Sequence, residues 1–450
     1  MATCKLRWYR AYSVLGYGTL LFFREKEKQI NYQTPRGTYD ILPDEVNRWH
    51  DVERVIAEMT KRYRYQEIRT PYFEATSVFA RENDSSDMVN KEMYTFTMGS
   101  DSYTLRPEGT AGVIRAFDQH KLYGSMELPA RFYYMGAMFR HERPQKGRQR
   151  QFTQFGVENI GIKSPEMDAE TIALGYDIVK AMGISSVKVC INTLGDDESR
   201  AAYRNALKEY FAPYLDQLCP DCHRRYEQNP LRILDCKVDH DQPFMKGAPK
   251  LSDYLTADAR EYFDRVLKAL DAIGIPYEID ERLVRGLDYY THTVFEVVST
   301  RPDSGAQATI FGGGRYDHFV EYYGGPEMSG IGFAIGLERL ISLAADEGYP
   351  FSQEDGLDVY VIGLGEVSRN VLQVVQQLRH EGFVAEGNLV SRGLKAQFKS
   401  ADRKKAKYIV IIGEQEAMDG TVNFKVAGEK EQMTLKMEEV SAHVKELEKK

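Results

Sequence analysis

The chain has 450 residues, of which 42% are hydrophobic and 28% are charged, so it can bury more than one hydrophobic core and we expect about two to four domains. Its net charge of −8, from 59 basic and 67 acidic side chains, excludes a protein that coats nucleic acid with its whole surface. Five cysteines, an odd number, argue against a disulfide framework and favour the reducing cytoplasm.

The first segment differs in character from the rest of the chain. Lys5, Arg7 and Arg10 precede a weakly apolar run over residues 11–23, which superficially resembles a signal peptide. The run has no small-residue cleavage site and is too short to span a bilayer, so we expect no membrane partner. We expect residues 1–33 to be a disordered or artefactual extension.

A helix and a strand are predicted next. Apolar residues recur at helical spacing over residues 44–63, which predicts a helix with one buried face. Residues 65–73 are expected to form a strand that runs into Pro71. The pair suits either a dimer contact or plain core packing, and the pattern does not separate the two.

Two short strands about Gly99 are predicted over residues 93–107, and a helix over residues 111–117. Glu108 and Thr110 therefore lie where a strand turns into a helix. A carboxylate there can bind an ammonium group or cap the helix, and capping is the more common role.

A β-hairpin with a basic loop is predicted from residues 131–138 and 149–157, with the turn at Pro144 and Gly147. From Arg140 to Arg150 the loop has five Lys or Arg side chains against one carboxylate, Glu142. Such a loop suits a nucleoside triphosphate, although a charge run by itself is more often a solvated surface. Gln154 and Glu158 are four residues apart on the second strand, so they share one face.

The next segment is expected to be a mostly helical insertion over residues 196–271, after a helix at 165–182 and a strand at 187–191. Within the insertion, Cys219 and Cys222 form a CxxC pair, with His223, Cys236 and His240 nearby. This pattern is half of a zinc site. Unliganded thiols are favoured over zinc, and we expect zinc to be dispensable.

Three glycine-rich stretches follow. Arg285 precedes Gly286 at the start of a β-branched run, three glycines stand together in residues 311–317, and residues 330–340 pass from a strand to a helix. Such glycines allow a ligand to approach the backbone, or simply allow close packing.

Residues 348–356 are interpreted as a linker. After them the chain changes to an alternating α/β pattern. Strands are expected at 359–363, 408–413 and 421–426, and helices at 367–381 and from Met437. Residues 391–407 carry seven Lys or Arg against Asp402 alone, which indicates a contact with a phosphate backbone.

Together these stretches resemble the bacterial histidyl-tRNA synthetases, which are class II aminoacyl-tRNA synthetases, from Pro35 to Lys450. Motif 1 of that class resembles the helix and strand ending at Pro71, motif 2 resembles residues 139–142 with their loop, and motif 3 resembles residues 332–339. Residues 283–290 and 312–317 resemble the two histidine-specific signatures. The chain has no Walker A, HIGH or KMSKS signature.

The resemblance implies an α+β catalytic domain with an antiparallel sheet at residues 34–347, containing the helical insertion, and an α/β anticodon-binding domain at residues 357–450. It also implies a homodimer that uses ATP and Mg²⁺ to activate L-histidine as histidyl-adenylate, with release of pyrophosphate. The histidyl group would then pass to its tRNA, with release of AMP.

The resemblance also implies roles for particular residues. Arg140 and Arg285 would be catalytic through the α-phosphate, while Glu158 and Tyr290 would read the two imidazole nitrogens. No protein side chain is assigned to a metal. The remaining implied contacts are with ATP (Arg140, Glu142, Arg148, Arg339), with histidine (Glu108, Thr110, Gln154, Glu158, Arg285, Tyr289, Tyr290) and with tRNA (Gln145, Lys146, Arg392, Arg403, Lys404, Lys405).

Two other interpretations stay open. A regulatory paralogue without charging activity would be expected to lose the Arg285 signature or the C-terminal domain, and this chain keeps both. A general nucleotide-binding scaffold accounts for the arginines but not for residues 358–450. The chain departs from the family pattern in its extension, at Thr291-His292 and at residues 83–84, outside the motifs.

Overall fold

The computed structural model describes residues 32–80, 86, 88–145, 147–236, 238–287, 289–302, 308–353, 356–390 and 393–449. The extension up to residue 31, residues 83–84, Lys146, Asp288 and Arg392 lie outside the described residues. The chain divides into two compact units. The first ends at Tyr349, and the second begins at Pro350 and also takes in Leu42–Asp51.

The first unit is built on a large sheet, in which eight strands are found among the described residues. Neighbouring strands are antiparallel except for the β1–β5 and β7–β8 pairs, so the predicted antiparallel sheet is confirmed. Their order across the sheet is β1 (Gln66–Glu67), β5 (Ala130–Phe139), β6 (Gln151–Ile160), β11 (Gly330–Gly336), β10 (Thr309–Tyr316), β9 (Thr291–Ser299), β7 (Val187–Thr193) and β8 (Tyr277–Ile279).

Helix α3 (Pro165–Ala181) covers one face of this sheet. A Cβ atom on Gly175 would meet the rings of Phe311 and Phe333, which shows how closely the helix backbone approaches the strands. Because side chains alternate along a strand, the even-numbered residues of β10 and β11 point to the opposite face. That opposite face carries the candidate site.

The predicted strand over residues 65–73 is wrong as a single element. The chain leaves the large sheet after β1, and Phe73 begins a separate sheet of order β2-β4-β3. Pro71 explains the break, because proline cannot donate to a ladder and restricts the residue before it. The small sheet comprises β2 (Phe73–Ala75), β4 (Asp101–Leu105) and β3 (Tyr94–Met98).

The helices predicted before the insertion are present, and the first of them begins in the segment Leu42–Asp51 that the second unit takes in. Helix α1 (Pro43–Arg62) buries Val52 and Ile56, as its periodicity predicts. Helix α2 (Thr110–Gln119) follows the small sheet and packs on β6, as does α8 (Leu337–Asp346), which follows β11; the short α7 (Phe319–Tyr322) contacts α2.

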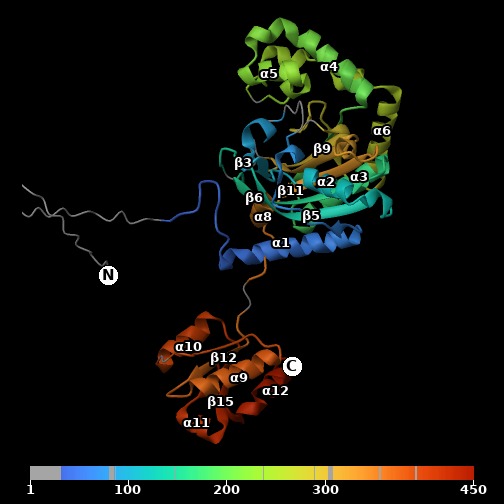
Figure 1. Ribbon diagram of the computed structural model, residues 1–450. Coiled ribbons are helices and arrows are strands. Elements are labelled where there is room, and N and C mark those ends of the chain that lie inside the picture. The colour runs from blue at the N-terminus through green and yellow to red at the C-terminus, as the bar shows by residue number, and fades with distance from the viewer. Residues whose placement is uncertain are drawn as a thin grey trace, which may run out of the picture. The chain divides into compact units, whose positions relative to one another are not determined.

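The insertion contributes Leu207, Phe211 and Phe244 to a hydrophobic core that also includes Tyr290 and, from β9, Val294. Helices α4 (Asp197–Phe211) and α5 (Pro220–Gln228) lie together at one end of the unit, as Figure 1 shows. Short 3₁₀ turns follow them, and α6 (Ala257–Ala272) returns the chain to pack against α3.

The second unit is an α/β domain, as predicted. Its sheet has the order β13-β12-β14-β15-β16, with parallel pairs on both sides of β12 and antiparallel pairs beyond β14. Valines of α9 (Ser368–His380) and α12 (Val440–Leu447) belong to one core, and Ala401 of α10 (Leu394–Arg403) belongs to another. The strands are β12 (Val359–Gly363), β13 (Ala385–Gly387), β14 (Tyr408–Ile412), β15 (Thr421–Val426) and β16 (Met433–Lys436), and α11 (Glu414–Asp419) joins β14 to β15.

The edge strands β13 and β16 were not predicted, because they are only three and four residues long. Nor does any helix in the described part of the chain have the length and apolar character needed to cross a membrane.

Candidate active site

The floor of the site consists of small residues in adjacent strands. Gly332 of β11 lies opposite Glu158 of β6 on one side and Gly314 of β10 on the other. The next row across the sheet contains Gly312 and Ala334. Directly opposed residues of antiparallel strands point to the same face, so these rows leave a shallow hollow in the sheet.

These glycines also make room for particular side chains. A Cβ atom on Gly332 would clash with the Glu158 carboxylate, and one on Gly312 would lie 2.5 Å from Nη1 of Arg285. Gly313, which points the other way, is needed for close packing, because its Cβ would clash with the Gly332 carbonyl. Of the two uses predicted for the glycines, close packing is confirmed at Gly313, whereas approach of a ligand to the backbone stays a prediction.

Glu158 lies at the centre of a buried hydrogen-bond network. Thr110 Oγ1 donates to its Oε1 over 2.6 Å, and the Tyr316 hydroxyl donates to its Oε2 over 2.5 Å. The side chain is 1% exposed, and this burial raises its pKa to about 8 although both hydrogen bonds favour the charged form. The Glu158 carboxyl can therefore change its protonation state near neutral pH.

Glu108 caps helix α2. Its carboxylate accepts hydrogen bonds from the backbone N–H groups of Thr110 at 2.7 Å and Ala111 at 2.8 Å. The capping role expected from the sequence is therefore present, and it places Thr110 where its hydroxyl reaches Glu158. Glu108 and Glu158 are thus connected through a single residue.

Gln154 shares the face of Glu158, as the spacing predicts. Its register partners are Gly136 on β5 and Gly336 on β11, so no bulky side chain stands beside it in the sheet. Gln154 is 9% exposed, and its Oε1 has no hydrogen-bond partner among the described residues. Buried side-chain oxygens are usually paired, so this orphan acceptor indicates a ligand.

Arg285 forms an ion pair with Glu296 of β9. Thr309 Oγ1 donates to the other carboxylate oxygen of Glu296 over 2.8 Å, and the Arg285 guanidinium lies 5.8 Å from the centre of the Tyr290 ring. The sequence did not indicate Glu296. Its place beside the site follows from the register, which sets it opposite Gly312.

The predicted hairpin is confirmed as β5 and β6. The register pairs Gly136 with Gln154, so Arg140, four residues after Gly136, continues the face of Gln154. The Arg140 guanidinium lies 5.3 Å from the Phe152 ring centre, and its Nε donates to the Pro107 carbonyl over 2.8 Å. The register, which the sequence left open, thus brings Arg140 to the site.

Guanidinium groups from separate elements surround a cavity of about 150 Å³. Nη1 of Arg148 lies 3.0 Å from Oε2 of Glu142, and Nη1 of Arg140 lies 3.9 Å from Oε1 of the same carboxylate. Arg339 of α8 donates to the Thr309 carbonyl, and its pKa is lowered by burial and then by the charge of Arg148. The lining residues are Arg140, Glu142, Gly147, Arg148, Gln149, Phe152, Gln154, Ile310, Gly336, Glu338 and Arg339.

A second cavity, of about 420 Å³, connects this cluster with the insertion. Arg140, Glu142 and Arg148 line both cavities, and Arg285 and Tyr290 line the second. Three implied ATP residues therefore share a cavity wall with two implied histidine residues, Arg285 and Tyr290. The insertion contributes Cys219, Asp221, Arg225, Arg232, Asp235, Cys236 and Val238 to the wall.

Some implied residues have other surroundings. Tyr289 stacks on Phe319 with ring centres 4.5 Å apart, and Gln145 forms a backbone bridge with Arg148. Tyr316 and Tyr134 were missed by sequence reasoning. The Tyr134 ring crosses Gly156, its register partner on β6, and this pairing could be found only once the strands are aligned.

The implied tRNA residues of the second unit lie at the end of α10. Arg403, Lys404 and Lys405 are all exposed there. Lys404 forms an ion pair with Glu386, and Nζ of Lys407 lies 2.9 Å from Oδ1 of Asp358. Part of the basic charge seen in the sequence is therefore neutralised within the domain.

The fold is that of a class II aminoacyl-tRNA synthetase, with its antiparallel sheet, arginine-bearing hairpin and separate α/β domain. A family model described as "Histidyl-tRNA synthetase" matches residues 37–340, and one described as "Anticodon binding domain" matches residues 358–447. The chain therefore belongs to the histidyl-tRNA synthetase family, whose members are ligases that use ATP as a substrate.

Similar proteins agree with this assignment. "Histidine--tRNA ligase" of Anoxybacillus flavithermus is 48% identical over 92% of this chain and 99% of its own length. "Histidine--tRNA ligase 1" of Shouchella clausii is 51% identical over 86% of this chain and 92% of its own length. The crystal structure of apo S. aureus histidyl-tRNA synthetase superposes with a TM-score of 0.78 at 38% identity, over 92% of this chain and 100% of that one.

Proposed function

We propose that the protein joins L-histidine to ATP, forming histidyl-adenylate and pyrophosphate, and then transfers the histidyl group to the tRNA for histidine, releasing AMP. The observation that carries the proposal is that guanidinium groups suited to phosphates and buried polar side chains suited to a small polar substrate lie in one region. Arg140, Arg148 and Arg339 line one cavity together with Gln154, which lies four residues before the buried Glu158 on the same face of β6. A phosphate chain and a small polar substrate would thus lie next to each other.

The first step needs positioning and charge neutralisation more than proton transfer. The histidine carboxylate attacks the α-phosphorus of ATP, a new oxygen–phosphorus bond forms, and pyrophosphate leaves with the electrons of the broken bond. The nucleophile is already an anion, so no general base is required. In this proposal Arg140 and Arg285 stabilise the charge on the α-phosphate, and Arg148 and Arg339 hold the rest of ATP.

Magnesium would be held chiefly by the phosphates. Carboxylate and phosphate oxygens are the ligands Mg²⁺ prefers, and Glu142 and Glu338 are the carboxylates on the described wall of the smaller cavity. Burial raises the pKa of Glu338 to about 7, and its Oε1 accepts the Thr153 N–H over 2.7 Å. Glu142 is therefore the better candidate, and a bound Mg²⁺ would neutralise phosphate charge there.

Histidine would be recognised by buried polar groups. In this proposal Glu158 and Tyr290 bind the imidazole nitrogens, and the orphan Oε1 of Gln154 accepts from the α-ammonium group. Glu108 uses its carboxylate oxygens to cap α2, so it would act on the ammonium group mainly through its charge. A substrate without the imidazole nitrogens would leave Glu158 poorly matched.

The remaining parts of the proposal concern assembly. The domain of residues 357–450 would bind tRNA, with residues 348–356 as a linker and Arg403 and Lys405 contacting phosphates. The protein would be a cytoplasmic homodimer that pairs through the motif 1 region, helix α1 and the segment up to Pro71, with the same patch on both partners. Light scattering should then report about twice the chain mass of 51.6 kDa.

The test is histidine-dependent exchange of pyrophosphate into ATP, followed by charging of tRNA. A regulatory paralogue would show no exchange, which would refute the proposal. Replacing Arg403, Lys404 and Lys405 together by Ala should raise the tRNA KM and flatten its salt dependence, while exchange stays unchanged. Lys430→Ala, an exposed lysine elsewhere in the same domain, is the control. Equal loss of exchange and charging in the folded triple variant would contradict the division of labour between the domains.

A further inference from the structure

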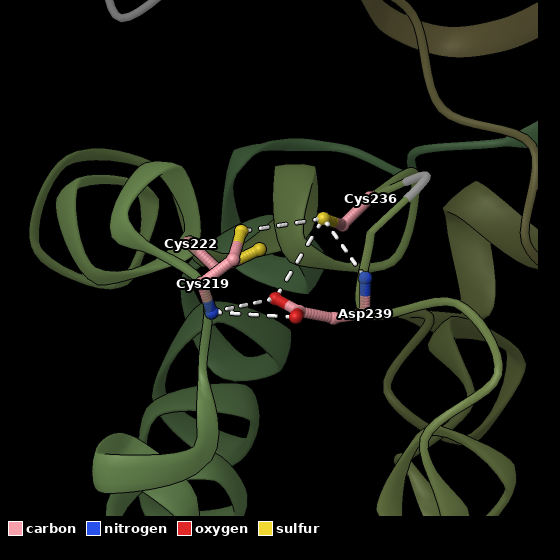
Figure 2. A group of neighbouring side chains, drawn as sticks. All are labelled: Cys219, Cys222, Cys236 and Asp239. Atoms are coloured by element: carbon pink, nitrogen blue, oxygen red, sulfur yellow. Dashed lines mark hydrogen bonds between the residues drawn. The ribbon is translucent and has the colours of Figure 1, made fainter.

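Four potential metal ligands converge in the insertion. Cys219 precedes helix α5 and Cys222 lies in its first turn, while Cys236 and Asp239 lie in the following loop. Figure 2 shows their side chains pointing toward one another, and one ligand atom from each lies within 4.8 Å of all the others. The group consists of two pairs, Cys219 with Cys222 and Cys236 with Asp239, and the members of each pair are three residues apart in sequence.

The distances fit a tetrahedral zinc ion. Sγ of Cys219 and Sγ of Cys236 are 3.7 Å apart, and Sγ of Cys236 is 3.6 Å from Oδ2 of Asp239. Zinc–sulfur bonds of about 2.3 Å and zinc–oxygen bonds of about 2.1 Å at tetrahedral angles place sulfurs about 3.8 Å apart, and a sulfur and an oxygen about 3.6 Å apart. These two separations therefore match those that zinc requires, and the remaining ones lie within 4.8 Å.

The carboxylate distinguishes this group from ordinary packing of thiols. Buried cysteines often behave as small hydrophobic residues, which would account for Cys222 and Cys236. Asp239 is only 2% exposed and makes no ion pair with any described residue, although it accepts the Cys219 N–H at 3.1 Å. A buried carboxylate beside apolar thiols is costly unless a cation balances it.

We infer that Cys219, Cys222, Cys236 and Asp239 bind one zinc ion. Three thiols lose their protons to solvent as the ion binds, and the carboxylate completes the four ligands. With no open coordination position, the ion is structural and takes no part in the reaction. This inference departs from the expectation of dispensable zinc, because the fourth ligand is an aspartate and not the exposed His223 or His240.

The position of the ion gives it a connection to the active site. Cys219 and Cys236 lie in the wall of the 420 Å³ cavity that Arg285 and Tyr290 also line. Three thiolates and one carboxylate around Zn²⁺ leave two negative charges, and Arg225 and Arg232 line the same cavity. Zinc would thus fix the wall that the insertion contributes. The inference rests on the insertion alone and does not depend on the proposed function.

The first test measures metal in the full-length protein, purified under reducing conditions without chelator. We expect about one zinc per chain by elemental analysis. Cobalt exchanged into the site should show the thiolate-to-metal absorption and the strong visible bands of a tetrahedral ion. Failure of the reduced protein to bind zinc or cobalt would overturn the inference, as would stoichiometric iron in place of zinc.

The second test uses matched variants. Cys222→Ser should weaken zinc binding by a factor of about 10² or more, and Asp239→Asn should weaken it about tenfold. One zinc should stay bound in three control variants. Two of them, His223→Ala and His240→Ala, remove histidines close in sequence to the site, and Cys190→Ala removes a cysteine outside it. Equal metal loss in these controls would refute the assignment. A Cys219–Cys236 disulfide that persists in the presence of a reducing agent would also refute the assignment.

Discussion

The proposed function gives the site a histidine side and a phosphate side, and the structure holds the two sides in different ways. On the histidine side, Glu158 is almost fully buried and receives two hydroxyl hydrogen bonds, and the floor beneath it is glycine. On the phosphate side, Arg148 and Arg285 are held by the carboxylates of Glu142 and Glu296, and about half of the Arg148 side chain is exposed.

Under the proposed function, this difference suits what each side would recognise. A small neutral ring is read by a few directional hydrogen bonds, which need fixed donors and acceptors that exclude water. A polyphosphate brings several negative charges of its own. Guanidiniums that are paired with carboxylates before binding avoid mutual repulsion, and they can exchange those partners for phosphate oxygens. The first side is therefore rigid, and the second is an arrangement of exchangeable ion pairs.

The largest expected effect is on the phosphate side. Arg285→Ala should lower the rate of pyrophosphate exchange by a factor of about 10² or more, because a guanidinium beside the reacting phosphate stabilises the transition state more than the ground state. Histidine binding should weaken less. Arg282→Ala removes an exposed arginine from the same segment and should leave the rate nearly unchanged. A folded Arg285→Ala enzyme with normal turnover, but lower stability, would reduce Arg285 to a structural partner of Glu296.

The next effect concerns stability and pH on the histidine side. The folded-state pKa of Glu158 is raised to about 8, so the native protein binds more protons than the unfolded chain between about pH 4.5 and 8. The free energy of unfolding should therefore fall as pH rises through this window, by up to a few kcal/mol. In Glu158→Gln this fall should be smaller. The free energy of unfolding would be measured by urea titration at several pH values. If it changed with pH equally in the two proteins, Glu158 would be ionised throughout this pH range.

Glu158→Gln should also raise the histidine KM by about tenfold or more, because it replaces one carboxyl oxygen, a possible acceptor for an imidazole N–H, with an amide NH2 that can only donate. The KM for ATP should change little, since the phosphate side is intact. Gln151→Ala, at the exposed start of the same strand, serves as the control. If both substrates lost affinity equally, the two sides of the site would not be separable.

The smallest expected effect probes the floor. Gly312→Ala places a methyl group 2.5 Å from Nη1 of Arg285, and the flexible end of that side chain can shift. We expect kcat to fall about threefold to tenfold with little loss of stability. Gly124→Ala, where a Cβ would meet nothing within 4 Å, should be neutral in both assays. An unchanged kcat in Gly312→Ala would mean that the position of Arg285 tolerates such a shift.

The sequence predicted elements that depend on local pattern. Helices α1 and α3, the hairpin of β5 and β6, and strand β12 each follow from periodicity or turn residues within a short window. It failed at Pro71, where a strand-like run is divided between two sheets. The short strands β8, β13 and β16 owe their existence to their neighbours and carry little signal of their own.

The site residues that were missed depend on contacts between distant segments. Tyr316 reaches Glu158, and Glu296 reaches Arg285, only because the strand registers bring those residues to the same face. Asp239 joins the cysteines through the fold of a loop. Carboxylates and tyrosines are too common for such roles to be predicted singly, whereas the resemblance to a family supplied the rest of the site.

The glycine floor also limits how the proposed histidine pocket could be redesigned. Gly312, Gly314 and Gly332 already have the smallest possible side chain, so no substitution there can deepen the hollow to admit a bulkier analogue of the amino acid. Any added volume has to come from the walls, for example by shortening Tyr290, whose ring lies against Gly314. Engineering for ring-substituted analogues should therefore begin with the tyrosines and leave the strands of the floor untouched.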